Sequence, residues 1–235
     1  MIDEKKVTAI IPARTGSKRL KDKNKLPING IPLIEISLIA ASCSKYIDQI
    51  IVSTDDAEIF QICQKYNIIL SKRPKHLCGD NITTVDVVLN CATTHNLNAD
   101  DLIILLQPTS PLRETSDIDL ALEFYQSKAA KSVVSVAETD HSPLWCNILP
   151  SDNNMDNFLP SNLQNIRSQE LPQHYRINGA IYITSLMQVK KTNKMISGID
   201  SYAFVMEKSH SVDIDNYIDY LLACAIFKDN LKKEI

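Results

Sequence analysis

The sequence lacks both glycine-rich motifs that most often hold a nucleotide. With only five glycines, it contains no GxxxxGK[ST] segment of P-loop proteins and no GxGxxG segment of dinucleotide-binding folds. These absences argue against a P-loop kinase and against a dinucleotide-dependent enzyme. The six cysteines are scattered, without a CxxC pair or a histidine at zinc-ligand spacing, so we interpret them as reduced thiols.

The chain also lacks a basic excess and a long hydrophobic run. Its formal net charge of -3 gives no overall positive field for nucleic acid, so any polyanion must be bound by a local cluster. The first apolar run, residues 7–12, is far shorter than a signal sequence or a membrane-spanning helix needs. We therefore expect a cytoplasmic protein that associates with neither a membrane nor nucleic acid.

The composition is that of an ordinary globular protein. The 235 residues are 44% hydrophobic and 23% charged, which is too apolar for general disorder. This length fits one domain with a modest insertion better than two full domains.

Short aliphatic runs alternate with longer segments of helical period, a pattern typical of βαβ units and a mainly parallel sheet. We therefore predict an α/β fold with helices flanking the sheet. The predicted strands are 7–11, 49–53, 68–71, 102–106, 132–136 and 180–183, and the predicted helices are 33–42, 57–66, 85–94 and 118–127.

The regular pattern is interrupted once and then resumes. Residues 138–177 are rich in Pro, Asn, Ser and Gln and show little periodicity, so we expect an inserted arm used in self-association. Residues 1–137 and 178–235 would then form the α/β domain. At its end, 215–232 carries Ile218, Leu221, Leu222 and Ala225 at helical spacing, which predicts a helix packed on the domain.

A basic loop, residues 12–24, follows the first predicted strand, where open α/β sheets bind their ligands. Gly16 and Ser17 allow backbone amides to converge on an oxygen anion, and neighbouring Arg and Lys side chains supply positive charge. The cations are Arg14, Lys18, Arg19, Lys21, Lys23 and Lys25. Such a loop suits a triphosphate, although a basic cluster alone is more often a solvated loop.

Four blocks carry a family resemblance. The string IIPARTGSKRLKDKN at 10–24 is similar to the N-terminal signature of the N-acylneuraminate cytidylyltransferase family, which activates acidic nine-carbon sugars. The strings LLQPTSPLR at 105–113, NGAIY at 178–182 and SVDID at 211–215 resemble later blocks of that family in the same order. The resemblance covers nearly the whole chain. It implies a Rossmann-like nucleotide-diphospho-sugar transferase fold, with the insertion forming a homodimer.

The resemblance also implies the nucleotide site. It places Arg14, Gly16, Ser17, Lys18 and Lys23 at the phosphates of CTP, and Asn24 beside the nucleotide. Lys23 would stabilise charge on the α-phosphate as pyrophosphate leaves, which makes it, with Arg14 and Asp213, a catalytic candidate. Arg73, Thr83 and Thr84 resemble the positions that read cytosine and face the ribose.

A candidate magnesium site lies near the C-terminus. Asp213 and Asp215 alternate along an extended segment, so their carboxylates would point to the same side and could ligate Mg²⁺. The alternative is that Asp215 caps the last helix. We favour the metal site because the basic loop and the family resemblance accompany it.

On the sugar side, the resemblance implies contacts from Gln107, Arg176, Asn178 and Tyr182. Gln107 follows a predicted strand, and its amide both donates and accepts hydrogen bonds, which suits a polyol. Taken alone, Asn178-Gly179 would predict only a turn.

Some positions depart from the family. Ser168 follows Arg167 where many relatives have two basic residues, and Trp145 stands where some carry Lys. An aromatic pair of some sialate enzymes has no counterpart near Ile196 and Ser197. Legionaminate and other nonulosonates therefore stay open as acceptors.

These features together predict Mg²⁺-dependent transfer of CMP from CTP to the anomeric hydroxyl of an N-acylneuraminate-like acid, with release of pyrophosphate. The enzymatic alternative is a cytidylyltransferase for the eight-carbon acid Kdo, which shares the first loop. The alternative of another class is a noncatalytic nucleotide- or RNA-binding module that uses the basic loop.

Overall fold

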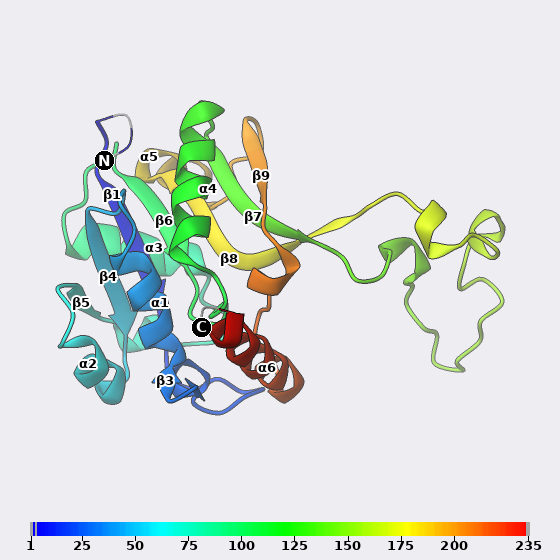
Figure 1. The fold of residues 1–235 in the computed structure, drawn as a ribbon. Coiled ribbons are helices and arrows are strands. Elements are labelled where there is room, and N and C mark those ends of the chain that lie inside the picture. Colours follow the sequence, from blue (N-terminus) through cyan, green and yellow to red (C-terminus); the bar gives the residue numbers. More distant parts are fainter. Residues whose placement is uncertain (1, 3, 234–235) are drawn as a thin grey trace.

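A computed structural model describes residue 2 and residues 4–233, and their side chains up to residue 230. A seven-stranded sheet runs through the centre in the order β5-β4-β1-β6-β8-β7-β9 (Figure 1). The neighbours β5, β4, β1 and β6 are parallel, β8 is antiparallel to β6 and β7, and β9 is parallel to β7. The predicted α/β fold with a mainly parallel sheet is confirmed. The strands are β1 (Val7–Pro12), β4 (Gln49–Thr54), β5 (Ile69–Lys72), β6 (Leu102–Leu106), β7 (Ser132–Glu138), β8 (Tyr175–Ser185) and β9 (Ser201–Val205).

Helices cover both faces of this sheet (Figure 1). Alternate residues of a strand point to opposite faces, so Ala9 and Ile11 of β1 join one buried cluster while Ile10 joins another. The first cluster includes side chains of α1 (Leu33–Ser42), α2 (Ala57–Cys63) and α4 (Thr115–Ser127). The second includes side chains of α3 (Thr84–Thr94) and α5 (Leu186–Thr192). The near-continuous apolar strands therefore follow from burial on both faces.

The last helix, α6 (Tyr217–Lys233), packs beside a small hairpin of β2 (Pro27–Ile28) and β3 (Ile31–Pro32). The predicted contact face was wrong. Ile218, Leu221 and Leu222 are exposed, at 75%, 49% and 51%. The face turned to the core carries Ala223 with Tyr220, Cys224 and Phe227 instead. Both faces of this helix are apolar, so spacing alone did not distinguish them.

All six predicted strands and all five predicted helices are present, with ends shifted by a few residues. The sequence patterns missed the hairpin, α5 and β9, which are short. They also missed the first half of β8, whose residues Tyr175 and Ile177 are exposed.

Residues 139–174 extend away from the body as an arm that contains only short 3-10 turns (Figure 1). Pairing of Glu138 with Tyr175 closes the base of this arm. Its use in self-association stays a prediction. Among the described residues, no helix has both the length and the apolar character needed to cross a bilayer.

Candidate functional site

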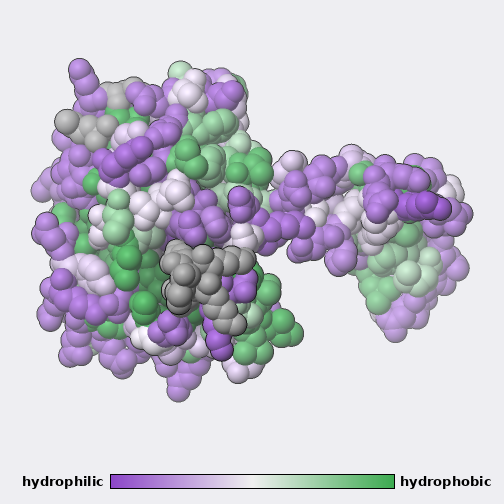
Figure 2. Space-filling model, in the orientation of Figure 1, coloured by the Kyte–Doolittle hydropathy of each residue, from purple (hydrophilic) through white to green (hydrophobic). Residues whose placement is uncertain are grey.

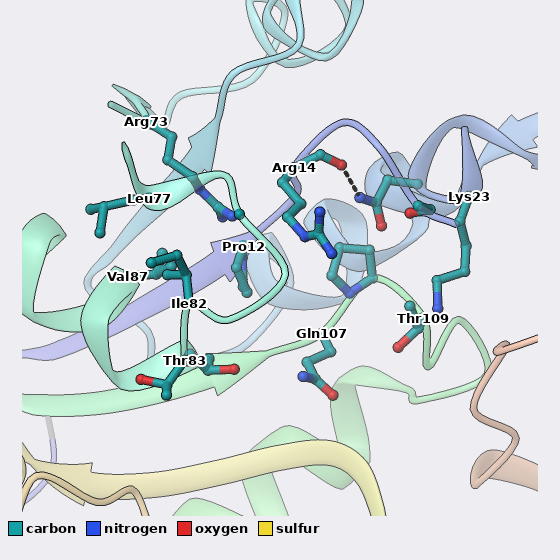
Figure 3. Close-up of a pocket in the computed structure, with 15 residues that line it drawn as sticks. Pro12, Arg14, Lys23, Arg73, Leu77, Ile82, Thr83, Val87, Gln107 and Thr109 are labelled. Atoms are coloured by element: carbon teal, nitrogen blue, oxygen red, sulfur yellow. Dashed lines mark hydrogen bonds between the residues drawn. The ribbon is translucent and has the colours of Figure 1, made fainter. Parts of the chain in front are cut away.

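A cavity of about 210 Å³ opens at the carboxyl edge of the parallel strands (Figure 3). Arg73 follows β5, Arg14 follows β1 and Gln107 follows β6, so the carboxyl ends of three strands from the parallel part of the sheet contribute side chains to one place. The predicted residues Arg14, Ser17, Lys23, Asn24, Arg73, Thr83, Thr84 and Gln107 all line this cavity. Residues separated by more than 90 positions in the sequence therefore share one site.

The basic loop has a fixed backbone. The amide of Ala13 bonds to the carbonyl oxygen of Ser53 at 2.9 Å. The amide and hydroxyl of Thr15 donate to the Asp55 carboxylate at 2.8 and 2.6 Å. Gly16 has φ +76°, a left-handed conformation that residues with a Cβ rarely adopt. The side-chain amide of Asn24 donates from Nδ2 to the carbonyl oxygen of Arg14 at 3.1 Å, so Asn24 holds the loop as well as lining the cavity (Figure 3).

Four cations of the loop are paired with acidic side chains from distant segments. Arg14 and Lys18 lie 2.9 and 2.5 Å from the carboxylate of Asp80. Lys23 and Arg19 lie 3.2 and 2.7 Å from Asp215. These six residues line a second cavity that adjoins the first at Arg14, Ser17 and Lys23. The result is a pre-assembled set of donors suited to polyphosphate oxygens.

Lys25 has a different role from its neighbours. Its ammonium lies 3.1 Å from both Asp56 and Glu58 and 3.6 Å from Asp22. Of the six cations noted in the sequence, this one is therefore committed to fixing the end of the loop against α2.

The far wall of the first cavity contains Arg73 and the start of α3. The Arg73 side chain is 5% exposed and donates to the carbonyl oxygen and hydroxyl of Ser53 at 2.9 and 3.2 Å. Burial lowers the pKa of its guanidinium. Thr83 caps α3 through a reciprocal pair with Asp86. The hydroxyl of Thr83 is thus already occupied, and Thr84 begins the helix beside it.

Asp213, a predicted catalytic residue, lies close enough to Lys23 and Asp215 for their charges to act on its carboxyl. Its Oδ1 atom is buried and has no hydrogen-bond partner among the described residues. Burial raises the pKa of this carboxyl and the nearby Asp215 adds to the effect, while a hydrogen bond from Thr109 and the charge of Lys23 oppose it. An unpaired buried carboxylate oxygen is costly unless a cation accompanies it.

Asp215 is not the cap of the last helix. The Oδ1 atom of Asn216 accepts hydrogen bonds from the amides of Ile218 and Asp219 at 2.8 and 3.2 Å, which is the capping role. The Asp215 carboxylate instead faces the basic loop. The capping alternative for Asp215 is therefore wrong.

Gly179 brings Gln107 and Asp213 together. Because β8 runs antiparallel to β6, its first half lies at the edge where β6 ends. Gly179 has φ +77°, and a Cβ placed there would lie 2.9 Å from Gln107 Oε1 and 3.5 Å from Asp213 Oδ2. A glycine is needed for both the conformation and the space.

Asn178 supports the site from within the protein. The side chain is 1% exposed. Its Oδ1 accepts from the Ser135 hydroxyl at 2.6 Å and its Nδ2 donates to Ser211 Oγ at 2.9 Å. It thereby joins β7, β8 and the segment that leads to Asp213. Arg176 is exposed and donates to the carbonyl oxygen of Ser211 at 3.1 Å.

Tyr182 lines a third cavity, which adjoins the first at Gln107, Thr83 and Thr84. Burial raises the pKa of its phenol, and the charge of Asp213 adds to that effect. Residues 193–196, which are both polar and apolar, also line this cavity. A ligand in this space would meet the nucleotide cavity beside Gln107.

Arg113 had no assigned role in the sequence. It is 2% exposed and donates to the carbonyl oxygens of Gln107 at 3.2 Å and Ala180 at 2.9 Å, and to the Ser37 hydroxyl at 3.0 Å. Burial lowers its pKa to about 10, which still leaves it charged at neutral pH. It fixes the Gln107 loop to β8. The sequence signal that could have indicated this role is the position of Arg113 at the end of the block 105–113, whose other residues are apolar or typical of turns.

Comparison with known proteins places this site in a family. The profile described as cytidylyltransferase matches residues 8–182, which include the basic loop, the Gln107 block and Gly179. The chain belongs to the cytidylyltransferase family. Cytidylyltransferases are nucleotidyltransferases, so the chain is an enzyme of that class.

Curated relatives of this cytidylyltransferase act on several acidic sugars, by their names. The chain is 33% identical over 223 residues to "CMP-N,N'-diacetyllegionaminic acid synthase" of Legionella pneumophila, covering 92% of this chain and 94% of the relative. It is also 33% identical to an N-acylneuraminate cytidylyltransferase of Streptococcus agalactiae, covering 92% of this chain but only 52% of that relative. The chain thus spans about half the length of the latter enzyme.

A solved structure supports the fold. The structure titled CMP:2-keto-3-deoxy-manno-octonic acid synthetase complexed with CTP has a TM-score of 0.70 and covers 96% of this chain and 99% of its own. At 20% sequence identity, this likeness establishes the nucleotidyltransferase fold alone.

Proposed function

We propose that this cytidylyltransferase transfers CMP from CTP to the anomeric hydroxyl of an N-acylneuraminate-like nonulosonic acid and releases pyrophosphate. The observation that carries the proposal is the junction at Gln107, Gly179 and Asp213. Gln107 lines both the basic nucleotide cavity and the cavity of Tyr182, and Gly179 lies against both Gln107 and Asp213. The named relatives, including the legionaminate enzyme, support a nonulosonic acid as acceptor.

The polar residues divide into two groups by position. Arg14, Ser17, Lys18 and Lys23 would hold the triphosphate, with Gly16 supplying the backbone turn and Asn24 fixing the loop beside the nucleotide. Arg73, Thr83 and Thr84 would surround the base and ribose. Charge develops on the phosphates as pyrophosphate leaves, and fixed donors already aimed there lower the barrier without reorganising. Lys23, which is 15% exposed and lines both the first and the second cavity, would act on the α-phosphate.

On the acceptor side, Gln107 and Tyr182 would contact the sugar directly. Arg176 lies close enough to Asp213 for its charge to act on that carboxyl, and it would pair with the carboxylate of the acid. Asn178 would act through the segment from Ser211 to Asp213, because its amide is already used by the protein.

The residues present fit a magnesium ion. Asp213 offers a buried oxygen without a partner, and Asp215 lies close enough to affect its pKa. Among the described residues, no three acidic, His or Cys side chains gather into a fuller metal site. Asp213 and Asp215 would thus share the ion with phosphate oxygens and water, as Mg²⁺ commonly does. Bound there, Mg²⁺ would neutralise phosphate charge and lower the pKa of the attacking hydroxyl.

The arm supports the proposal of a homodimer. Ile148, Leu149 and Met155 on the arm are exposed at 89%, 50% and 57%, and Figure 2 shows an apolar patch at its far end. Ile218 and Leu221 on α6 are exposed as well. Apolar surface of this kind is typical of an interface. Sedimentation of the wild type should give twice the chain mass, and Ile148→Asp should shift the species toward one chain mass.

A substrate panel tests the proposed reaction. Pyrophosphate release would be measured with Mg²⁺, each of CTP, ATP and GTP, and each of N-acetylneuraminate, N,N'-diacetyllegionaminate and Kdo. We expect release with CTP and a nine-carbon acid and much less with the other nucleotides. Turnover restricted to Kdo would support the eight-carbon alternative, and tight, salt-dependent RNA binding without turnover would support the noncatalytic one.

A further inference from the structure

The carboxylate of Asp80 forms ion pairs with Arg14 and Lys18, two cations that would also bind a polyphosphate. It comes from the loop between the 3-10 turn Lys75–Leu77 and α3, 66 residues after Arg14. Arg14 Nη2 donates to its Oδ1 at 2.9 Å, and Lys18 Nζ lies 2.5 Å from its Oδ2. Arg14 Nη1 also donates to the carbonyl oxygen of Cys78 at 3.2 Å. The loop around Asp80 is thereby tied to the basic loop, and Arg14, Lys18 and Asp80 all line the second cavity.

These contacts have the chemistry of phosphate binding. A carboxylate and a phosphate both accept charge-assisted hydrogen bonds from Arg and Lys, so they compete for the same donors. Hydrogen bonds from Lys18 and Arg14 hold the pKa of Asp80 below its ordinary value, which keeps the competitor ionised. A triphosphate entering this cavity would have to displace Asp80 and would then be repelled by it.

We propose that Asp80 is an intramolecular competitor of polyphosphates, which positions Arg14 and Lys18 before CTP binds and reclaims them as pyrophosphate departs. This rests on the proposed use of CTP. In this account Asp80 weakens the binding of CTP and pyrophosphate and hastens product release. CMP, with one phosphate, competes less with Asp80 than CTP does.

Calorimetric titration of the Mg²⁺-loaded protein with CTP, CMP and pyrophosphate tests the proposal. Asp80→Asn keeps the shape of the side chain and removes its charge. The side chain is 44% exposed, so the substitution should leave the fold intact. Exposed ion pairs are individually weak. Without the pairs that Asp80 forms with Arg14 and Lys18, CTP and pyrophosphate should bind about three- to tenfold more tightly. CMP binding should change less, and the inhibition constant of pyrophosphate during turnover should fall in parallel.

Asp200→Asn is the matched control. Asp200 is 48% exposed and pairs with Lys131 at 2.7 Å, away from the cavity residues, so its loss should not change any of the three affinities. Asp80→Glu, which restores the charge, should bring affinity back toward the wild type.

Unchanged or weaker binding of CTP and pyrophosphate to Asp80→Asn would overturn the competitor role, while leaving the cytidylyltransferase proposal standing. An equal gain for CMP, CTP and pyrophosphate would also overturn it, because the effect would not follow the number of phosphates. Failure of the wild type to bind CTP or pyrophosphate would overturn both proposals.

Discussion

Replacing Gly179 with alanine should displace Gln107 and so impair use of the acceptor more than binding of CTP. The new Cβ would lie 2.9 Å from Gln107 Oε1, a distance that Cβ atoms essentially never show, so the glutamine amide must move. Asp213 Oδ2, at 3.5 Å, would be in ordinary contact and need not move. A misplacement of about 1 Å at a reacting site can cost about a hundredfold in rate. We therefore expect kcat/KM for the acid to fall by about ten- to a hundredfold.

The same substitution should also lower stability through the backbone. At φ +77°, an alanine costs about 1–2 kcal/mol relative to a right-handed conformation. For a chain of this size that corresponds to a drop in Tm of about 2–8 °C. Pyrophosphate release with the acid varied at saturating CTP gives kcat/KM, and calorimetry gives the affinity for CTP.

Gly30→Ala separates the two effects. Gly30 has φ +81° and no atom within 4 Å of an added Cβ, so it imposes the same backbone strain without a collision. It should lower Tm comparably and leave kcat/KM for the acid unchanged. Equal kcat/KM values for Gly179→Ala and the wild type would refute the placement of Gln107 in the acceptor site.

Three further predictions concern single charges. Lys23→Ala should lower kcat by about a hundred- to a thousandfold while changing CTP affinity only several-fold, because its contribution is greatest as charge shifts on the phosphates; an unaltered kcat would remove it from the mechanism. Asp213→Asn should raise the Mg²⁺ concentration needed for half-maximal turnover, and indifference to Mg²⁺ would argue against a metal ligand. Burial raises the pKa of Glu35, but hydrogen bonds from Lys65 and Tyr66 outweigh it and leave the pKa below its ordinary value. Glu35→Gln should thus lower Tm at pH 7, and the difference from the wild type should shrink as pH falls below about 4.5.

The sign for Glu35 follows from its depressed pKa. A carboxyl with a lower pKa in the folded chain stabilises the fold above its unfolded pKa and loses that contribution as it becomes protonated. A difference in Tm that grew in acid would contradict the assignment. For the Lys23 comparison, Lys25→Ala is not a neutral control, because Lys25 holds Asp56 and Glu58.

The central strands were predictable because burial on both faces leaves runs of aliphatic residues such as Leu102–Leu106. By contrast, β9 (Ser201–Val205) is an edge strand with mostly exposed residues, so its sequence carries little hydrophobic signal. The two-sided apolar character of α6 likewise hid which face packs inward. In these places tertiary context, rather than local pattern, decides the structure.

For the site, the order of the motifs along the sequence grouped candidate residues, eight of which line one cavity. It did not distinguish residues that face the cavity from residues that support it. Asn178 and Arg113 carry polar groups that suit a ligand, yet their hydrogen bonds go to the protein. The pairing of Asp80 with Arg14 joins segments 66 residues apart, and no spacing rule predicts such a pair. The hydrogen bonds of Asn178 and Arg113 and the pairing of Asp80 with Arg14 are therefore visible only in the structure.

The most direct test of the account follows the anomeric oxygen. The acid would carry ¹⁸O at its anomeric hydroxyl and react with CTP and Mg²⁺, and the products would be examined by mass spectrometry and ³¹P resonance. If the hydroxyl attacks the α-phosphate, the label must appear in the CMP-sugar, on the oxygen that bridges carbon and phosphorus. Label in the pyrophosphate, or the absence of a labelled CMP-sugar, would contradict the proposed reaction.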